Sequence, residues 1–324
     1  MRVLRPYLLI VLGVWALGTL AAYLYAQQLG LAWGSVVGLL PAFLLEAAFY
    51  VALGRDDMRK ALEKIPPPML AFGMWITALI PYALAGLPLT SVNFAWLAGL
   101  TFLASFWYVF LPHVGFSDIV FLGFLAAIML TKVFDRLYPT PVPKLHIEIL
   151  GQLMLIRTAV FALLCLRKIR GVGFGFVPSR KDWMVGTQYY LMFLPVAVVL
   201  ALWLKFVTLR WPPHPWWKAS LIALGTFLGI LWVVALSEEF LFRGLLQQGL
   251  DKLSGSKWTG LIAASLLFGS VHLWYRAFPN WRFAVLAAVA GVFYGLAFRS
   301  GKGIRASMVT HALTVTTWKV FFSQ

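Results

Sequence analysis

The sequence is poor in cysteine and in charge, and both shortages narrow the class of protein. Its single cysteine, Cys165, excludes an intrachain disulfide and a cysteine-based metal site, and a thiol inside an apolar helix is ordinarily inert. Only 12% of the residues are charged, whereas 61% are hydrophobic and 16% are aromatic. We find no internal repeat, low-complexity tract or soluble domain in the sequence. This composition is typical of a polytopic membrane protein.

The charge that is present is strongly one-sided. The chain has 27 Lys and Arg residues but only 11 Asp and Glu residues, which gives a formal net charge of +16. In a soluble protein this excess would suggest a nucleic-acid partner, but here the basic residues fall in short connections, where they orient membrane helices. We therefore expect the lipid bilayer as a partner and no nucleic acid. Basic connections at residues 54–64 and 167–181 predict a cytoplasmic N-terminus.

Apolar segments of about 17 to 25 residues recur along the chain, and about 20 residues suffice to cross the hydrocarbon. No open sheet could satisfy its backbone there. The sequence therefore predicts an all-α fold, a polytopic transmembrane helical bundle of about eleven spans. The expected spans cover about 7–25, 31–53, 69–87, 91–111, 117–135, 146–166, 187–209, 217–240, 259–275, 283–299 and 303–322.

The segment 237–243, Ser-Glu-Glu-Phe-Leu-Phe-Arg, follows an apolar run with two adjacent carboxylates. An ionisable side chain inside a membrane span is costly and marks a functional site by default. On a helix, Glu239 and Arg243 form an i,i+4 pair that can make a salt bridge, whereas Glu238 is turned about 100° away. We expect Arg243 to hold Glu239 ionised while Glu238 stays free to act as a general base. The alternative is a salt-bridged cluster that only anchors the helix.

Two later histidines extend this candidate site. His272 follows Phe268 by four residues, so both lie on one helical face, and His311 lies in the last span. At about 1.5 Å per residue, Glu238, His272 and His311 all reach the middle of the bilayer. One carboxylate and two imidazoles at a common depth can activate water or bind a divalent metal ion. A lone histidine in such a helix is otherwise a hydrogen-bonded packing residue.

Few other polar residues interrupt the first 200 positions. Glu46 lies in the middle of the second span, where we favour an interhelical hydrogen bond over a second site. His146 and Glu148 follow a Pro-rich connection, and we expect them at the membrane interface rather than as a ligand pair.

The three motifs together resemble a known family. Glu238-Glu239-x-x-x-Arg243, Phe268-x-x-x-His272 and the later His311 are similar to the successive motifs of the CPBP family, the CAAX-protease and bacteriocin-processing intramembrane glutamic endopeptidases, also called the Abi family. The resemblance covers residues 217–324, which it identifies as a protease core, and leaves residues 1–216 as a transmembrane region of unknown role. It implies that Glu238 and His272 activate the attacking water, that Glu239 and Arg243 support the site, and that His311 helps to stabilise the oxyanion.

One position departs from the family pattern. The last motif is usually His-x-x-x-Asn, but Val315 stands four residues after His311 and has no hydrogen-bond donor in its side chain. Losing one oxyanion donor typically slows such a reaction about a hundredfold or more. Thr314 or Thr316 could supply the missing donor, or His311 could act alone.

These observations predict an intramembrane endopeptidase of the bacterial inner membrane. Its substrate would be a membrane-associated polypeptide, such as a C-terminal sorting signal or a prenylated tail, cleaved by activated water without a cofactor. Zinc held by Glu238, His272 and His311 is a less favoured mechanism, because no His-Glu-x-x-His motif is present. The alternative from another class is a non-catalytic membrane protein, a transporter or an immunity factor, whose Glu, His and Arg cluster is structural.

Overall fold

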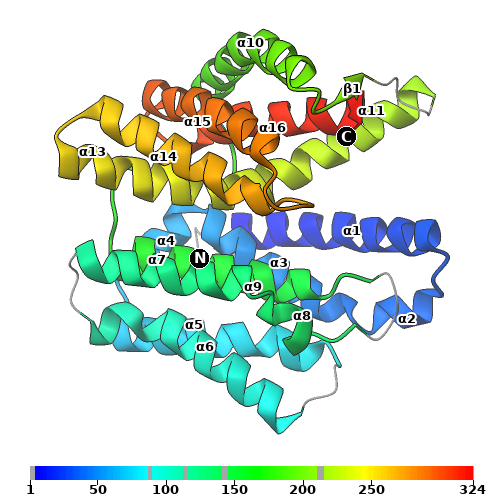
Figure 1. Ribbon diagram of the computed structural model, residues 1–324. Coiled ribbons are helices and arrows are strands. Elements are labelled where there is room, and N and C mark those ends of the chain that lie inside the picture. Colours follow the sequence, from blue (N-terminus) through cyan, green and yellow to red (C-terminus); the bar gives the residue numbers. More distant parts are fainter. Residues whose placement is uncertain (1–3, 87–89, 112–114, 141–144, 210–214, 324) are drawn as a thin grey trace. The chain divides into compact units, whose positions relative to one another are not determined.

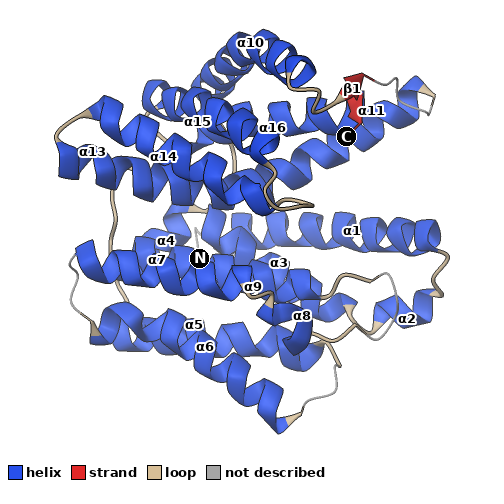
Figure 2. Cartoon of the chain, in the orientation of Figure 1, coloured by secondary structure: helices blue, strands red, loops and turns tan. Residues whose placement is uncertain are grey.

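The computed structural model describes residues 4–86, 90–111, 115–140, 145–209 and 215–323. Nearly all of this part of the chain is helical, apart from a two-stranded antiparallel pairing of β1 (Thr208–Leu209) with β2 (Phe322–Ser323) (Figure 2). The predicted all-α membrane bundle is therefore confirmed. A helix meets its own backbone hydrogen bonds, so it suits an apolar sequence in hydrocarbon.

Each predicted span overlaps a helix in the described part of the chain, and the span predicted at 31–53 covers two helices, Trp33–Val37 and Leu40–Gly54. Seven helical segments are long and apolar enough to cross a membrane: Leu4–Leu29, Pro67–Leu84, Ser91–Phe110, Glu148–Leu166, Arg180–Trp203, Trp216–Ser254 and Trp281–Gly301. Two shorter apolar helices are Leu40–Gly54 and Gly115–Leu130. The remaining two predicted spans correspond to Lys257–Val271, which has 15 residues, and Ile304–Phe321, which carries several polar side chains.

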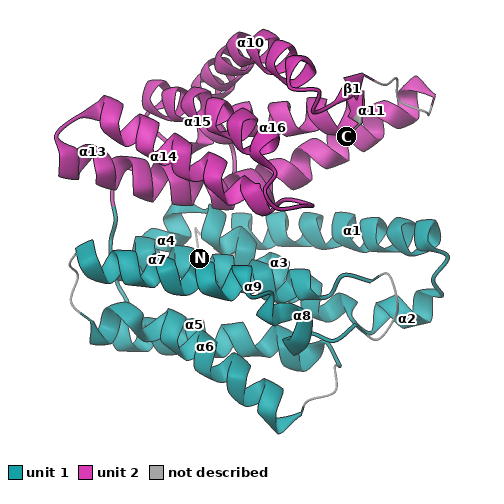
Figure 3. Cartoon of the chain, in the orientation of Figure 1, with its two compact units in different colours: residues 1–169 teal, residues 170–324 magenta. Residues whose placement is uncertain are grey.

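The chain folds into two compact units, residues 1–169 and 170–324 (Figure 3). The helices of unit 1 are α1 (Leu4–Leu29), α2 (Trp33–Val37), α3 (Leu40–Gly54), α4 (Asp56–Leu62), α5 (Pro67–Leu84), α6 (Ser91–Phe110), α7 (Gly115–Leu130), α8 (Val133–Leu137) and α9 (Glu148–Phe161), which a π-helical segment extends over Ala162–Leu166 (Figure 1). Its apolar core gathers side chains of α3, α5, α6, α8 and α9, including Tyr82, Leu97 and Met154. Glu46 of α3 lies in this unit.

The helices of unit 2 are α10 (Arg180–Trp203), α11 (Trp216–Gly229), α12 (Leu236–Glu239), α13 (Gln248–Ser254), α14 (Lys257–Val271), α15 (Trp281–Gly301) and α16 (Ile304–Phe321). Helix α15 packs against α10, α14 and α16, and Phe193, Phe268 and Tyr294 belong to an apolar core shared by α10, α14 and α15. The division between 1–216 and 217–324 drawn from the sequence remains a prediction about the protease core. The compact unit itself begins at Arg170, because α10 packs on α15 and α16.

Helices α11, α12 and α13 are parts of one continuous helix of 39 residues, Trp216–Ser254. Two π-helical segments, Ile230–Ala235 and Phe240–Gln247, lie on either side of α12. A helix of this length extends roughly 58 Å, well beyond the thickness of the hydrocarbon. The helix therefore continues past residue 240, where the predicted span ends. Isolated π-helical turns occur frequently at functional sites, and here they enclose the two adjacent glutamates.

Candidate active site

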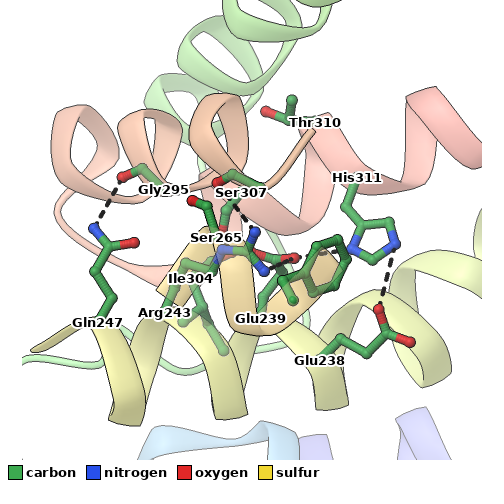
Figure 4. Close-up of polar contacts among 12 residues, drawn as sticks. Glu238, Glu239, Arg243, Gln247, Ser265, Gly295, Ile304, Ser307, Thr310 and His311 are labelled. Atoms are coloured by element: carbon green, nitrogen blue, oxygen red, sulfur yellow. Dashed lines mark hydrogen bonds and ion pairs between the residues drawn. The ribbon is translucent and has the colours of Figure 1, made fainter. Parts of the chain in front are cut away.

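The predicted pair of Glu239 and Arg243 is present and deeply buried. Arg243 Nη1 donates to Glu239 Oε1 at 3.1 Å, and the two side chains are only 1% and 0% exposed. His311 of α16 donates from Nδ1 to the same carboxylate oxygen at 2.9 Å (Figure 4). Two donors on one oxygen compensate for the loss of hydration that a buried carboxylate suffers. Glu239 therefore joins the helix of the Glu-Glu motif to α16.

Arg243 is held by contacts that the side-chain motif does not show. Its Nη2 donates to the carbonyl oxygen of Gly291 in α15 at 3.1 Å. The guanidinium group also lies over the rings of Phe268 and Tyr294, 4.5 Å and 5.3 Å from their centroids. Aromatic faces stabilise a desolvated cation, so this surrounding allows a guanidinium with 1% exposure. The arginine is a fixed support rather than a mobile group.

Gln247, like Arg243, donates a hydrogen bond to a backbone carbonyl oxygen of α15. The sequence motifs did not predict this contact. Gln247 lies four residues after Arg243, is fully buried, and donates from Nε2 to the carbonyl oxygen of Gly295 at 3.3 Å (Figure 4). A Cβ atom at residue 295 would lie 2.5 Å from Gln247 Oε1 and would overlap Leu261. With alanine at this position, the ends of the Leu261 and Gln247 side chains would have to shift. The four-residue spacing of Gly291 and Gly295, matched to that of Arg243 and Gln247, is the signal that could have revealed the pair.

Glu238 differs from its neighbour in being accessible and uncommitted. Its side chain is 32% exposed, and its Oε2 lies 3.8 Å from Nε2 of His311. That separation is too long for a direct hydrogen bond. No hydrogen bond to Glu238 is present among the described residues. The gap between the carboxylate and the imidazole is suited to a water molecule that forms a hydrogen bond with each.

The hydrogen bond at Nδ1 fixes the orientation of His311. Because a carboxylate only accepts, Nδ1 carries the hydrogen, and Nε2 is the ring nitrogen that faces Glu238. The ring also stacks on Tyr294 with centroids 4.7 Å apart and an angle of 17° between the planes. The imidazole is therefore held at one nitrogen and on one face, while the second nitrogen points to the free carboxylate.

His272 approaches the same region from the end of α14. It begins a short 3-10 turn, and its Nδ1 donates to the carbonyl oxygen of Phe268 at 2.7 Å. The Phe268 ring lies 4.9 Å from the His272 ring and 5.9 Å from the His311 ring, so it lies against both imidazoles. His272 is within electrostatic range of Glu238 and His311. No direct hydrogen bond joins it to another predicted site residue in the described part of the chain.

Threonines flank Val315, the position at which the family pattern has asparagine. Thr314 already donates its hydroxyl hydrogen to the carbonyl oxygen of Thr310 at 2.8 Å. The Thr316 hydroxyl is buried and has no hydrogen-bond partner among the described residues. Of the two threonines considered as substitutes for Asn, Thr316 is therefore the one whose hydroxyl is uncommitted. Val315 itself leaves this turn without a polar side chain at that position.

No three His, Cys, Asp or Glu side chains form a group that could hold a metal ion in the described part of the chain. The proposed zinc ligands Glu238, His272 and His311 thus do not converge in the manner of a zinc site. Each imidazole uses Nδ1 in a hydrogen bond, to Phe268 and to Glu239, and keeps Nε2 for other contacts.

The other polar residues that the sequence singled out lie elsewhere. Glu46 belongs to unit 1, where Arg157 Nε donates to its Oε1 at 2.7 Å, in agreement with an interhelical contact rather than a second site. His146 contacts Glu148 at 2.8 Å, and the His146 side chain is 67% exposed. Neither residue set shares a unit with Glu238.

Comparison with known proteins agrees with the motifs. Residues 219–317 match the family model described as type II CAAX prenyl endopeptidase Rce1-like. The match covers about a third of the chain and includes Glu238, Glu239, Arg243, His272 and His311. No curated protein and no solved structure matches the chain. Residues 219–317 are therefore similar to the type II CAAX prenyl endopeptidases, which confirms the resemblance predicted from the three motifs.

Proposed function

We propose that this chain is a glutamic-type intramembrane endopeptidase that hydrolyses a peptide bond of a membrane-associated polypeptide. The observation that carries the proposal is the contrast between two adjacent carboxylates. Glu239 is buried and held by Arg243 and His311, whereas Glu238 is partly exposed and faces His311 across 3.8 Å. A fixed carboxylate beside a free one is the arrangement that a general base with a positioned partner requires.

The first step is attack by water. Glu238 accepts a proton from a water molecule, and the water oxygen forms a bond to the carbonyl carbon of the substrate. His272 orients this water through Nε2, since its Nδ1 is committed to the Phe268 carbonyl group. The carbonyl oxygen of the substrate gains the negative charge. No bond to the enzyme forms, so the intermediate is not covalently attached.

The second step is cleavage of the carbon–nitrogen bond. His311, protonated at Nε2 and balanced by the Glu239 carboxylate, donates a hydrogen bond to the oxyanion. As the bond breaks, Glu238 returns its proton to the leaving amine. The products are a carboxylic acid and an amine, between which one proton then passes to give a carboxylate and an ammonium group, and Glu238 regains its original charge.

The substrate class follows from the environment of the site. Helices long and apolar enough to cross a membrane surround the candidate residues, so the polypeptide must reach them from within the bilayer or from its surface. A hydrophobic C-terminal sorting signal or a prenylated tail meets that requirement. We further propose that the protein resides in the bacterial inner membrane with its N-terminus in the cytoplasm, in accordance with its basic connections.

The experiment is a mass-spectrometric comparison of membrane-protein termini in native cells. The cells carry the wild type, Glu238→Gln, His272→Ala or the control Glu148→Gln at equal abundance. Glu148 also lies beside a histidine, but in unit 1, so its replacement removes a comparable carboxylate outside the site. We expect one or a few polypeptides to lose a processed terminus in both site variants and to keep it in the control. Termini that are unchanged in both site variants would contradict the proposal and favour a non-catalytic membrane protein.

A further inference from the structure

The connection from His272 to α15 exposes an unusual number of aromatic side chains. Trp274 and Phe278 are each 64% exposed, Trp281 is 52% exposed and Tyr275 is 44% exposed. Arg276 and Arg282 are exposed as well. We call residues 274–282 the aromatic-basic loop. It begins two residues after a proposed catalytic histidine, so whatever contacts this loop also acts close to the site.

Hydrogen bonds hold the loop in a defined conformation. The Asn280 backbone N–H donates to the carbonyl oxygen of Leu273 at 2.8 Å, and Asn280 Nδ2 donates to the carbonyl oxygen of Tyr275 at 3.0 Å. Asn280 Oδ1 accepts from the backbone N–H of Phe283 at 3.3 Å. One asparagine thus joins both ends of the loop. The exposed rings are presented on a fixed backbone, which lowers the entropy lost when they bind.

The cations of the loop lie beside its rings and lack carboxylate partners. Arg276 lies over the Tyr275 ring and Arg282 over the Trp281 ring, 5.5 Å and 5.7 Å from the centroids. Arg282 Nη1 also donates to the carbonyl oxygen of Lys205 at 3.3 Å, which adds a third exposed cation. No salt bridge involves these three residues in the described part of the chain.

The charge of the surrounding sequence leaves this loop uncompensated. Residues 252–324 contain no Asp or Glu. The acidic residues of unit 2 are Asp182, Glu238, Glu239 and Asp251. Asp182, Glu239 and Asp251 are paired with Arg305, Arg243 and Arg299, respectively. These three carboxylates are therefore engaged elsewhere, and the exposed cations of the loop remain available to an anionic partner from outside the chain.

The position of the loop relative to the bilayer identifies the partner. Trp281 is the first residue of α15, which is long and apolar enough to cross a membrane. We therefore place the loop at a membrane surface. Exposed tryptophan beside arginine is typical of the headgroup level, where rings enter the interface and guanidinium groups bind phosphates. We infer that the aromatic-basic loop, together with Lys205, is a docking surface for anionic phospholipid headgroups.

An acidic segment of a polypeptide would satisfy the charge of the loop but not its exposed rings. Four large aromatic side chains gain free energy by leaving water, and the bilayer interface offers this to all of them at once. The inference concerns contact with lipid and does not depend on the proposed protease activity.

The test places an environment-sensitive dye on the loop and asks which lipid surrounds it. The dye is attached to Ala277→Cys in a Cys165→Ala background, and the full chain is reconstituted in nanodiscs. Spin-labelled phosphatidylglycerol or equally labelled phosphatidylcholine quenches the dye at the same mole fraction. We compare the parent with Arg276→Gln/Arg282→Gln and with the control Lys252→Gln/Lys257→Gln. The control removes the same charge from exposed residues outside the loop.

We expect phosphatidylglycerol to be enriched around the dye about fivefold or more over phosphatidylcholine, a preference that 1 M salt reduces. The loop variant should lower the ratio to near one, whereas the control should keep it. Equal quenching by both lipids in the parent protein would overturn the inference. An equal loss of the lipid preference in the control variant would also overturn the inference, since the preference would then reflect the total charge of the protein. A loop variant that keeps the lipid preference but loses cleavage of acidic peptides would reassign the loop to substrate docking.

Discussion

Each of the two units contains a buried carboxylate paired with an arginine, but the two pairs are differently arranged. In unit 1, both oxygens of Glu46 accept from Arg157, at 2.7 Å from Nε and 3.1 Å from Nη2. The remaining donors of Arg157 reach the side chain and the backbone of Thr77. This pair is closed: every acceptor of the carboxylate is engaged, and both side chains are at most 2% exposed.

In unit 2, Glu239 receives both of its donors on Oε1, and its Oε2 is buried without a hydrogen-bond partner among the described residues. A second carboxylate, Glu238, stands next to it with 32% of its side chain exposed. The comparison separates two uses of the same residue types. The closed pair of Glu46 and Arg157 joins helices. We call Glu239 and Arg243 the open pair, because one carboxylate oxygen accepts no hydrogen bond from the described residues; beside it, the free carboxylate of Glu238 remains able to accept and return a proton.

The largest expected effect separates activity from stability at Glu238. Glu238→Gln should lower the rate of cleavage by about 10²–10⁴-fold, because a general base is lost. Thermal unfolding of the purified protein should be unchanged, since the side chain makes no hydrogen bond in the described part of the chain. The rate is measured on the substrate identified from processed termini. A matching fall in unfolding temperature would indicate a structural carboxylate instead.

The converse is expected in unit 1. Glu46→Gln should lower the free energy of unfolding by about 3–5 kcal/mol, because Arg157 would remain buried with an uncompensated charge. The joint replacement Glu46→Leu/Arg157→Met should recover most of that loss, since no charge remains buried. Denaturant titration in detergent micelles measures both. Cleavage per folded molecule should be unaffected, and a selective loss of cleavage would show that the closed pair takes part in chemistry.

A smaller effect is expected at the contact between Gln247 and α15. Gly295→Ala should cost about 1–3 kcal/mol, because the added Cβ would overlap Leu261 and crowd Gln247. Gly225→Ala in α11 is the matched control, since a Cβ there meets nothing within 4 Å. The control should change the unfolding free energy by no more than about 1 kcal/mol. An equal loss of unfolding free energy at both positions would mean that the close approach at residue 295 does not affect stability.

The smallest effect is expected at the exposed His146–Glu148 contact. His146→Ala should change the unfolding free energy by less than about 1 kcal/mol, because exposed ion pairs contribute little. Cleavage should be the same as in the wild type. A large loss of activity here would show that unit 1 contributes directly to the reaction.

The sequence predicts those parts of the site that depend on spacing along one helix. Glu239 and Arg243 pair because they are four residues apart, and Phe268 and His272 meet for the same reason. The predicted spans all overlap helices because apolar segments in hydrocarbon have few other structures available.

The remaining contacts join residues that are distant in sequence. Arg157 lies 111 positions after Glu46, and no local pattern connects the two. The carbonyl oxygens of Gly291 and Gly295 are backbone acceptors, so they carry no side-chain signal beyond the spacing of the glycines. The contact of His311 with Glu239 depends on how α16 packs in unit 2, which hydropathy alone does not determine.

The most direct test of the difference between the two pairs is the amount of processed substrate per copy of the protein in cells, measured by mass spectrometry for Glu238→Gln and Glu46→Gln. Glu238→Gln should accumulate normally and process almost no substrate. Glu46→Gln should accumulate less but process a normal amount per copy. If Glu238→Gln retained normal processing per copy, Glu238 would not be the general base, and the assignment of the open pair to catalysis would be wrong.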